Sequence, residues 1–272
     1  MTDASPVAAL FDLLSSTYDT TGVAYFQPIA DRLLAELGPE PGERWLDVGC
    51  GAGAVTLPAA RAVGPEGTVV GVDLAPGMVR RCAAAAAAEG LGHLRAVVGD
   101  AAAPPVPGPF DAVSSSLVLF FLDDPAAALR AWAALLRPGG RLGVVTFGPQ
   151  DAWWDDLDAV FRPYLPEAML DARTSGQEGP FRSDAGMERL VAGAGYSDVR
   201  TVAWVLPVRF ESAAAYLDWT MTTGQRAMWM RVPEERRPAV RAELTSMLDA
   251  HAGPDGSIAL HQGVRITLAA RP

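Results

Sequence analysis

The chain contains no lysine, and its 22 basic residues are arginines that never occur more than two in a row. The chain also contains 32 acidic residues, which gives a net charge of −10 and a pI of about 4.8. Because phosphate binding relies on clustered lysine and arginine, this composition argues against a nucleic acid partner. It argues equally against docking on an anionic membrane surface.

Cysteine, histidine and long apolar runs are also scarce. The two cysteines, Cys50 and Cys82, have neither metal-site spacing nor a disulfide pattern, so no metal is expected. The histidines, His93, His251 and His261, lack the context of a catalytic triad. No signal segment opens the chain, and no apolar run reaches the ~18 residues that a membrane span requires. We therefore expect a cytoplasmic protein that does not bind a membrane.

The most informative feature that is present is the run WLDVGCGAG at residues 45–53. An apolar, strand-like segment leads into Gly49, Gly51 and Gly53, and a helix-compatible stretch follows. Glycine reaches positive φ without steric cost and lets a ligand lie directly on the backbone. The start of the following helix favours an anionic ligand group. The run therefore predicts a strand, a tight turn and a ligand-binding helix start.

Four further apolar segments predict strands with functional residues at their ends. They are residues 68–73, ending at Asp73; 94–101, containing Asp100; 110–116, ending in Ser115 and Ser116; and 141–147, preceded by Pro138-Gly139-Gly140. Helix-length segments separate most of them, which indicates a parallel sheet buried on both faces. Ligands of such sheets bind at the carboxyl ends of the strands, where these residues stand.

The motif order LDVGCGAG, VVGVD, GDA, FDAV and LRPGG resembles the class I S-adenosylmethionine-dependent methyltransferases, especially their small-molecule and quinone-methylating branches. The resemblance covers roughly residues 18–150 and continues more weakly beyond them. A nicotinamide-binding protein would show G-x-G-x-x-G instead. The resemblance implies an α/β fold with a Rossmann-like seven-stranded methyltransferase sheet and helices on both faces.

The same resemblance implies three parts in one domain. Residues 1–40 would form an N-terminal helical cap, and residues 41–148 the S-adenosylmethionine-binding core. Residues 149–272 would supply a substrate insert, further helices and the closing strands. The last strand, near residues 260–269, would be the antiparallel partner that closes the sheet.

The implied cofactor is S-adenosylmethionine, with S-adenosylhomocysteine as product. Asp73 would accept hydrogen bonds from the ribose, Gly49 and Gly51 would pack on the methionine part, and Asp100 would face the adenine. The other cofactor-binding candidates are Asp47, Leu74, Met78, Ala101, Ser115, Ser116 and Tyr25. Simpler interpretations stay open: Asp73, Asp100 and the serines as caps of strand ends, and Met78 as ordinary packing between helix and sheet.

On the substrate side, Tyr18 is the one catalytic candidate, because it lies in the segment that caps the cofactor in similar proteins. Phe120 stands where many relatives have histidine, which removes a candidate base. The residues expected to line a substrate pocket are Phe120, Trp153, Trp154, Phe161 and Trp219. Core packing is the alternative for each of these aromatic residues.

We expect methyl transfer from S-adenosylmethionine to a small, largely apolar or aromatic molecule of secondary metabolism, by a monomer or homodimer. The alternative is a protein of the same fold that binds the cofactor without methylating, such as a cyclase or a regulatory or partner subunit. The reason for this alternative is that no residue is a convincing general base. The residues name neither the substrate nor the accepting atom, because this fold hosts many acceptors.

Overall fold

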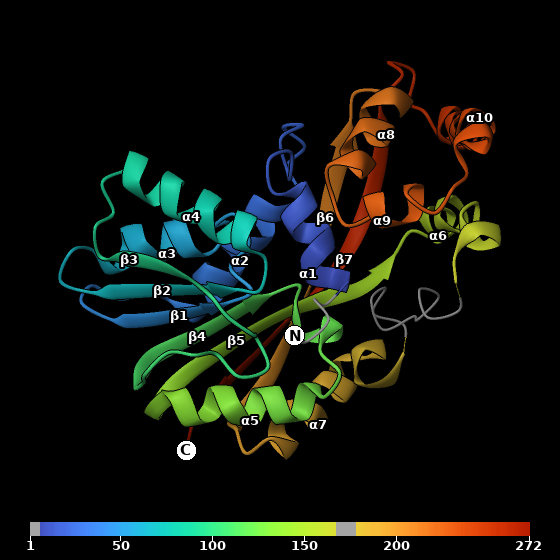
Figure 1. The fold of residues 1–272 in the computed structure, drawn as a ribbon. Helices are drawn as coiled ribbons and strands as arrows, with labels where there is room; N and C mark the ends of the chain where they lie inside the picture. The colour runs from blue at the N-terminus through green and yellow to red at the C-terminus, as the bar shows by residue number, and fades with distance from the viewer. Residues whose placement is uncertain (1–5, 167–177) are drawn as a thin grey trace.

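Seven strands form a single sheet in the computed structural model, which describes residues 6–166 and 178–272. In chain order the strands are β1 (Arg44–Val48), β2 (Thr68–Asp73), β3 (Leu94–Val98), β4 (Phe110–Ser116), β5 (Leu136–Gln150), β6 (Ser197–Phe210) and β7 (Ile258–Ala270). Their order across the sheet is β3-β2-β1-β4-β5-β7-β6 (Figure 1). The first five strands run parallel, while β7 is antiparallel to both β5 and β6.

The central strand β1 is buried on both faces. Trp45, Leu46 and Val48 are fully buried, as expected for a parallel strand covered by helices on two sides. One neighbour of β1 is β2 and the other is β4, so the strand order reverses at this point. Ligands of open α/β sheets bind at the carboxyl ends of the strands beside such a reversal. The topology therefore puts the glycine turn at the expected binding edge.

Helices cover the sheet on two faces (Figure 1). One face carries α2 (Phe26–Leu37), α3 (Thr56–Val63) and α4 (Pro76–Ala88), and the other carries α5 (Pro125–Leu135) and α7 (Asp184–Gly193). The helix α2 shows the sequence logic: Ile29, Leu33 and Leu37 recur every four residues and are all buried. It ends at Gly38, which takes the left-handed conformation at φ 59°.

The remaining helices lie beyond these two layers. The helix α1 (Pro6–Leu14) packs against α4. The helix α6 (Ala152–Ala159) follows β5, while α8 (Ala213–Met221), α9 (Arg226–Trp229) and α10 (Arg237–Asp249) lie in the chain between β6 and β7. We call α6 and α8–α10 the C-terminal lobe; it gathers at the far end of the β6–β7 hairpin (Figure 1). Short 3-10 segments are η1 (Leu119–Phe121), η2 (Arg162–Tyr164), η4 (Gly179–Arg182) and η5 (Glu234–Arg236).

The structure confirms the predicted fold class, with two differences of detail. The third strand ends at Val98 rather than at residue 101, so Asp100 lies in the turn that follows it. The fifth strand begins at Leu136, so the Pro-Gly-Gly sequence lies inside it rather than before it. The reason is tertiary: the Gly139 amide donates to the Arg271 carbonyl, and the Arg271 amide donates to Gly140. This end of β5 is paired by the C-terminus of the chain, which local sequence does not reveal.

Candidate active site

The glycine turn after β1 forms one wall of the candidate site. Gly49 and Gly51 adopt positive φ, at 75° and 52°. A Cβ added at Gly49 would collide with the Val118 side chain, whereas no described atom lies within 4 Å of the corresponding position at Gly51. A ligand can therefore approach the backbone at Gly51. At Gly49 the Val118 side chain packs against the turn and leaves no room for a side chain.

Asp73, at the end of β2, holds this turn in place. Its Oδ2 accepts from the Gly51 amide and its Oδ1 from the Ala75 amide, both at 2.9 Å. Burial raises the pKa of the carboxyl, and the amides of Ala75, Gly51 and Leu74 oppose that rise. The carboxylate therefore joins the glycine turn to the start of α4, at the edge where sequence predicted a ribose contact.

Asp47 lies beneath the turn and is only 1% exposed. It accepts hydrogen bonds from the hydroxyls of Thr56, at 2.6 Å, and Ser114, at 2.8 Å. The Ser114 hydroxyl also accepts from Trp45 Nε1 at 2.9 Å. Burial raises the pKa of Asp47 to about 6, although both hydroxyls lower it. This buried network joins β1 to α3 and β4, so it supports a role for Asp47 in orienting the loop that follows β1.

Residues at the neighbouring strand ends surround the turn. Leu74 is 41% exposed, an unusual position for a large apolar side chain. Asp100 caps its own turn through the Ala102 amide at 2.8 Å, and the Ala101 carbonyl accepts from Trp132. Ser116 is half-buried. Ser115 is fully buried, and its Oγ finds no hydrogen-bond partner in the described part of the chain.

The cap helix α1 is fixed on α4. Asp12 Oδ1 accepts from the Gly77 amide at 2.6 Å, and Arg81 donates to the carbonyls of Ser15 and Tyr18. Met78 is buried beneath Leu14 of α1, so the structure places it in packing contact with the cap.

Tyr18 lies where the cap meets the turn. Burial raises the pKa of its phenol well above the usual range, and the charges of Asp19 and Asp73 add to that effect. Its ring packs on Phe11 at 5.8 Å and on Phe26 at 5.1 Å. A neutral phenol is thus present near Asp73, but it is a poor base.

Tyr25 points away from the turn and into the C-terminal lobe. Its hydroxyl donates to Gln262 Oε1 on β7 at 3.2 Å, and its ring lies 5.1 Å from that of Trp219. Trp219 in turn packs on other aromatic rings of the lobe and its hairpin. We call the set the aromatic cluster; its members are Tyr25, Trp154, Phe210, Tyr216 and Trp219. Every member is at least nine-tenths buried.

The other aromatic candidates are dispersed. Phe161 packs on Trp229 at 5.0 Å, and Trp153 stacks on His251 at the contact between α6 and α10, with 4.2 Å between ring centroids. Phe120 is buried in the core and stacks on Phe147. Its neighbour Phe121 is 37% exposed and meets Phe11 of the cap at 6.0 Å. Of these two neighbouring rings, the one that meets the cap is therefore that of Phe121.

Sequence analysis missed a polar pair within the lobe. Gln225 Nε2 donates to Asp158 Oδ1 at 3.1 Å. Burial, followed by the nearby Asp155, raises the pKa of Asp158 to about 7. The available signal was an acid in the apolar, Trp-rich stretch of α6, but nothing local distinguished it from Asp155 and Asp156.

The comparisons with known proteins agree with this geometry. A family model described as "Methyltransferase domain" matches residues 46–140. The nocamycin O-methyltransferase of Saccharothrix syringae is 41% identical over 275 residues, covering 97% of this chain and 98% of that protein. The chain belongs to the class I S-adenosylmethionine-dependent methyltransferases. The expected function, methyl transfer to a small molecule of secondary metabolism, is confirmed, and so are the enzyme class and the cofactor.

Two further proteins resemble this methyltransferase. The aklanonic acid methyltransferase of Streptomyces sp. (strain C5) is 40% identical, over 61% of this chain and 76% of that protein. A phosphoethanolamine N-methyltransferase of Haemonchus contortus, solved in complex with S-adenosyl-L-methionine, superposes with a TM-score of 0.53 at 17% identity. It covers 90% of this chain and 52% of that one, and at this identity it supports the fold alone.

The residues at the carboxyl edge of the methyltransferase sheet fit S-adenosylmethionine. The open backbone at Gly51 admits a ligand, and the exposed Leu74 offers an apolar surface beside Asp73. The unpartnered Ser115 Oγ adds a buried polar atom at the end of β4. An anionic acceptor, an apolar surface and an open backbone suit a ribose, an adenine and an amino acid moiety.

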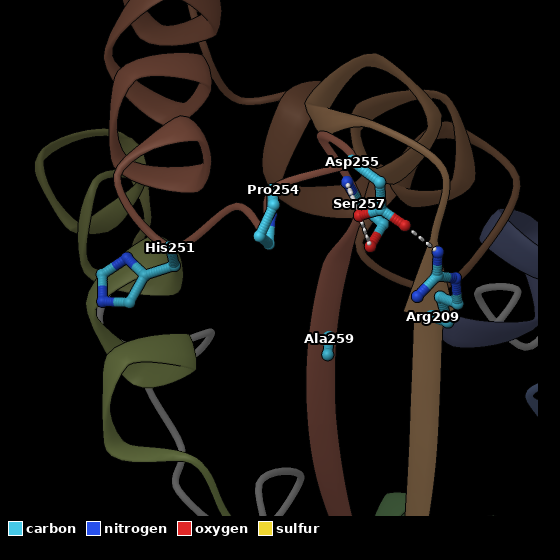
Figure 2. Close-up of a pocket in the computed structure, with 7 residues that line it drawn as sticks. Arg209, His251, Pro254, Asp255, Ser257 and Ala259 are labelled. Atoms are coloured by element: carbon cyan, nitrogen blue, oxygen red, sulfur yellow. Dashed lines mark hydrogen bonds and ion pairs between the residues drawn. The ribbon is translucent and has the colours of Figure 1, made fainter.

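A hollow on the methyltransferase surface lies elsewhere. It is lined by residues at the far end of the β6–β7 hairpin and the end of α10, including Arg209, His251 and Asp255 (Figure 2). Arg209 and Asp255 form an ion pair with 2.6 Å between nitrogen and oxygen, and both side chains are mostly exposed. This exposed ion pair is a surface contact of little energetic weight.

None of the described helices is long and apolar enough to cross a membrane.

Proposed function

We propose that this methyltransferase acts on an oxygen atom of a small, largely apolar or aromatic molecule. One observation carries the proposal: the likeness to an O-methyltransferase extends over nearly the full length of both chains, beyond the cofactor-binding motifs. The match therefore includes the lobe and cap that differ most among proteins of this fold. The exposed Phe121 beside Phe11 supports an apolar acceptor at the carboxyl edge.

The cofactor-side roles follow from the positions of the residues. Asp73 would accept from the ribose hydroxyls, Leu74 and Ala101 would flank the adenine, and Asp100 would face it. The methionine part would lie along Gly49 and Gly51, with Ser115 and Ser116 at the end of β4. Asp47 would act from below through Thr56 and Ser114. Met78 and Tyr25, which pack on the cap and the lobe, would shape the site indirectly.

S-adenosylmethionine supplies an electrophilic methyl group, so the protein's task is alignment and exclusion of water. Tyr18, Phe11 and Phe121 would close the cap over the reacting atoms. The phenol of Tyr18 stays protonated, because its pKa is raised by burial and by nearby acids. It would therefore position a substrate or carboxylate group by donating a hydrogen bond, rather than remove a proton.

We assign three parts to the chain on the same basis: a cap at residues 1–40, the cofactor-binding core at 41–148, and an acceptor-binding region at 149–272. We also infer a cytoplasmic enzyme that works as a monomer or homodimer. Size-exclusion chromatography with light scattering tests the oligomeric state.

The experiment measures turnover with methyl-deuterated S-adenosylmethionine and a panel of phenols and aromatic carboxylic acids. Mass spectrometry detects the labelled products. We expect labelled products whose methyl group is bound to oxygen. Mild alkali then separates methyl esters, which release methanol, from stable ethers. Calorimetry with S-adenosylhomocysteine is the control for a folded cofactor site. Products labelled only on carbon or nitrogen would refute the choice of oxygen.

A further inference from the structure

The last turn of α8 and the segment that joins it to α9 hold an unusual concentration of unpartnered polar atoms. Trp219 Nε1, Thr223 Oγ1 and Gln225 Oε1 are all buried, and none finds a hydrogen-bond partner in the described part of the chain. They fall within seven consecutive residues. Burying a donor or acceptor without a partner is costly, so native structures seldom group such atoms without a reason.

A buried acid stands beside this segment. Asp158 of α6 accepts from Gln225 Nε2 at 3.1 Å, and no arginine of the described chain pairs with it. Its charge also raises the pKa values of Tyr25 and Tyr216 in the aromatic cluster, after the larger effect of burial on each. Asp158 and Gln225 are only partly buried as whole residues, so the pair keeps an accessible side.

The location links the pair to the cofactor side. The Asp19 amide donates to the Thr222 carbonyl at 3.2 Å, which ties the cap to the α8–α9 segment. A series of ring contacts runs from Tyr18 through Phe26 and Tyr25 to Trp219. These contacts place the α8–α9 segment directly beside the cap that covers the glycine turn.

We propose that Asp158, Trp219, Thr223 and Gln225 form the polar end of the acceptor site, where they bind a neutral hydroxyl group on an aromatic acceptor. This inference rests on the proposed function. It states which group the acceptor must have at a distance from the atom that is methylated. The four residues are specificity-determining rather than catalytic.

The chemistry of the four groups selects a hydroxyl. The indole N–H of Trp219 needs an acceptor, while the hydroxyl oxygen of Thr223 can accept from a donor. A hydroxyl supplies both, whereas a carboxylate can only accept and would be repelled by Asp158 when that residue is ionised. The rings of the aromatic cluster beside these groups suit an aromatic frame.

The test measures binding without turnover, in the presence of S-adenosylhomocysteine, with 2-naphthol and naphthalene as probes in equilibrium dialysis. We expect the wild-type enzyme to prefer the naphthol by about tenfold or more, because a site built to bind a hydroxyl discriminates against its absence. Trp219→Phe removes the N–H and keeps an aromatic ring. That variant and Asp158→Asn should each reduce the preference several-fold.

Two matched controls lie in the same lobe. Trp229→Phe removes an indole N–H that already donates to Thr220 Oγ1 at 2.9 Å, and Asp156→Asn changes an exposed acid on the same helix as Asp158. Both should keep the full naphthol preference. Calorimetry with S-adenosylhomocysteine checks that every protein retains a folded cofactor site.

Unchanged preference in both Trp219→Phe and Asp158→Asn, or no preference in the wild type, would overturn the assignment. A wild type that prefers the naphthol but methylates no oxygen in the labelling experiment would instead refute only the proposed O-methyl transfer. The two failures are therefore distinguishable.

Discussion

Two buried carboxyl groups, one under the glycine turn and one in the C-terminal lobe, are satisfied very differently. Asp47 accepts from two hydroxyls at 2.6 and 2.8 Å, whereas Asp158 receives one hydrogen bond within the described part of the chain, from an amide at 3.1 Å. Burial is the leading cause that raises both pKa values, to about 6 and about 7. The network around Asp47 is therefore closed internally, whereas the residues beside Asp158 include three buried polar atoms without a partner in the described chain.

The difference indicates that Asp47 supports the fold, whereas Asp158 takes part in recognising a ligand. A carboxyl whose partners are all internal fixes the backbone above it, here the strand that leads into Gly49. A carboxyl beside unpartnered donors and acceptors has capacity left for a ligand. Four substitutions, taken from the largest expected effect to the smallest, test whether this contrast holds.

Asp47→Ala should lower the free energy of unfolding by about 3–5 kcal/mol, because it removes two short hydrogen bonds to a carboxyl and orphans two buried hydroxyls. Urea denaturation measures the loss. Asp156→Ala, at an exposed position, is the control and should change stability little. A loss below about 1 kcal/mol for Asp47→Ala would show that the network is not a structural support.

Asp158→Asn should show the opposite sign at neutral pH. An acid whose pKa is raised on folding holds its proton more tightly in the folded state, so wild-type stability falls as pH rises from about 4 to 7. Asparagine cannot ionise and avoids this fall. The variant should therefore gain about 1–3 kcal/mol relative to wild type between about pH 4 and pH 8.

Urea midpoints across that range check the prediction, with Asp156→Asn as control. Asp155 is the other acid whose charge acts on Asp158, and Tyr25 and Tyr216 remain neutral throughout because their pKa values are raised. A stability difference that does not vary with pH would mean that folding does not raise the pKa of Asp158.

Asp73→Ala separates the cofactor side from the lobe. We expect it to weaken S-adenosylhomocysteine binding by about 1–3 kcal/mol in calorimetry, since the ribose would lose a charged acceptor and the Gly51 amide its partner. Asp158→Asn should leave that affinity unchanged. Gly51→Val should be worse than Asp73→Ala, because it adds a branched side chain at φ 52° in the open space of the turn. Equal binding by Asp73→Ala and wild type would show that the ribose lies elsewhere.

Asp12→Ala should have the smallest effect, about 0.5–1 kcal/mol in thermal unfolding. Asp12 caps the start of α4 from outside, through the Gly77 amide, because Ala75 at the cap position has no side-chain oxygen. Limited proteolysis of the cap should accelerate more than global unfolding does. Asp123→Ala, at an exposed loop position, serves as control. Unaltered proteolysis would mean that other contacts hold the cap.

Much of the core could be predicted because its signals are local. The strands 68–73 and 110–116 appear with the predicted bounds, since apolar spacing and flanking glycine and proline fix such elements. The motif order also located the edge where Gly51, Asp73 and Ser115 gather. What could not be predicted was pairing at long range: β5 is extended by contact with Arg271, and Phe121 meets Phe11 of the cap.

Arg265 illustrates the same limit. It is buried on β7, where it donates to Asp184 at 2.7 Å and to the carbonyls of Phe147 and Phe181. No sequence pattern distinguished it from the other arginines. Its partners lie between 81 and 118 residues away along the chain, so only the folded sheet reveals that this charge is internal.

The sequence by itself determined the sheet, the glycine turn and the acids at the strand ends, because these depend on neighbouring residues and on backbone geometry near them. Only the tertiary structure decided which side chains complete the site. Tyr25 bonds to Gln262, Trp153 stacks on His251, and Asp158 meets Gln225 across the lobe. Each contact joins segments separated by tens of residues or more, and its existence depends on how helices pack rather than on any local preference.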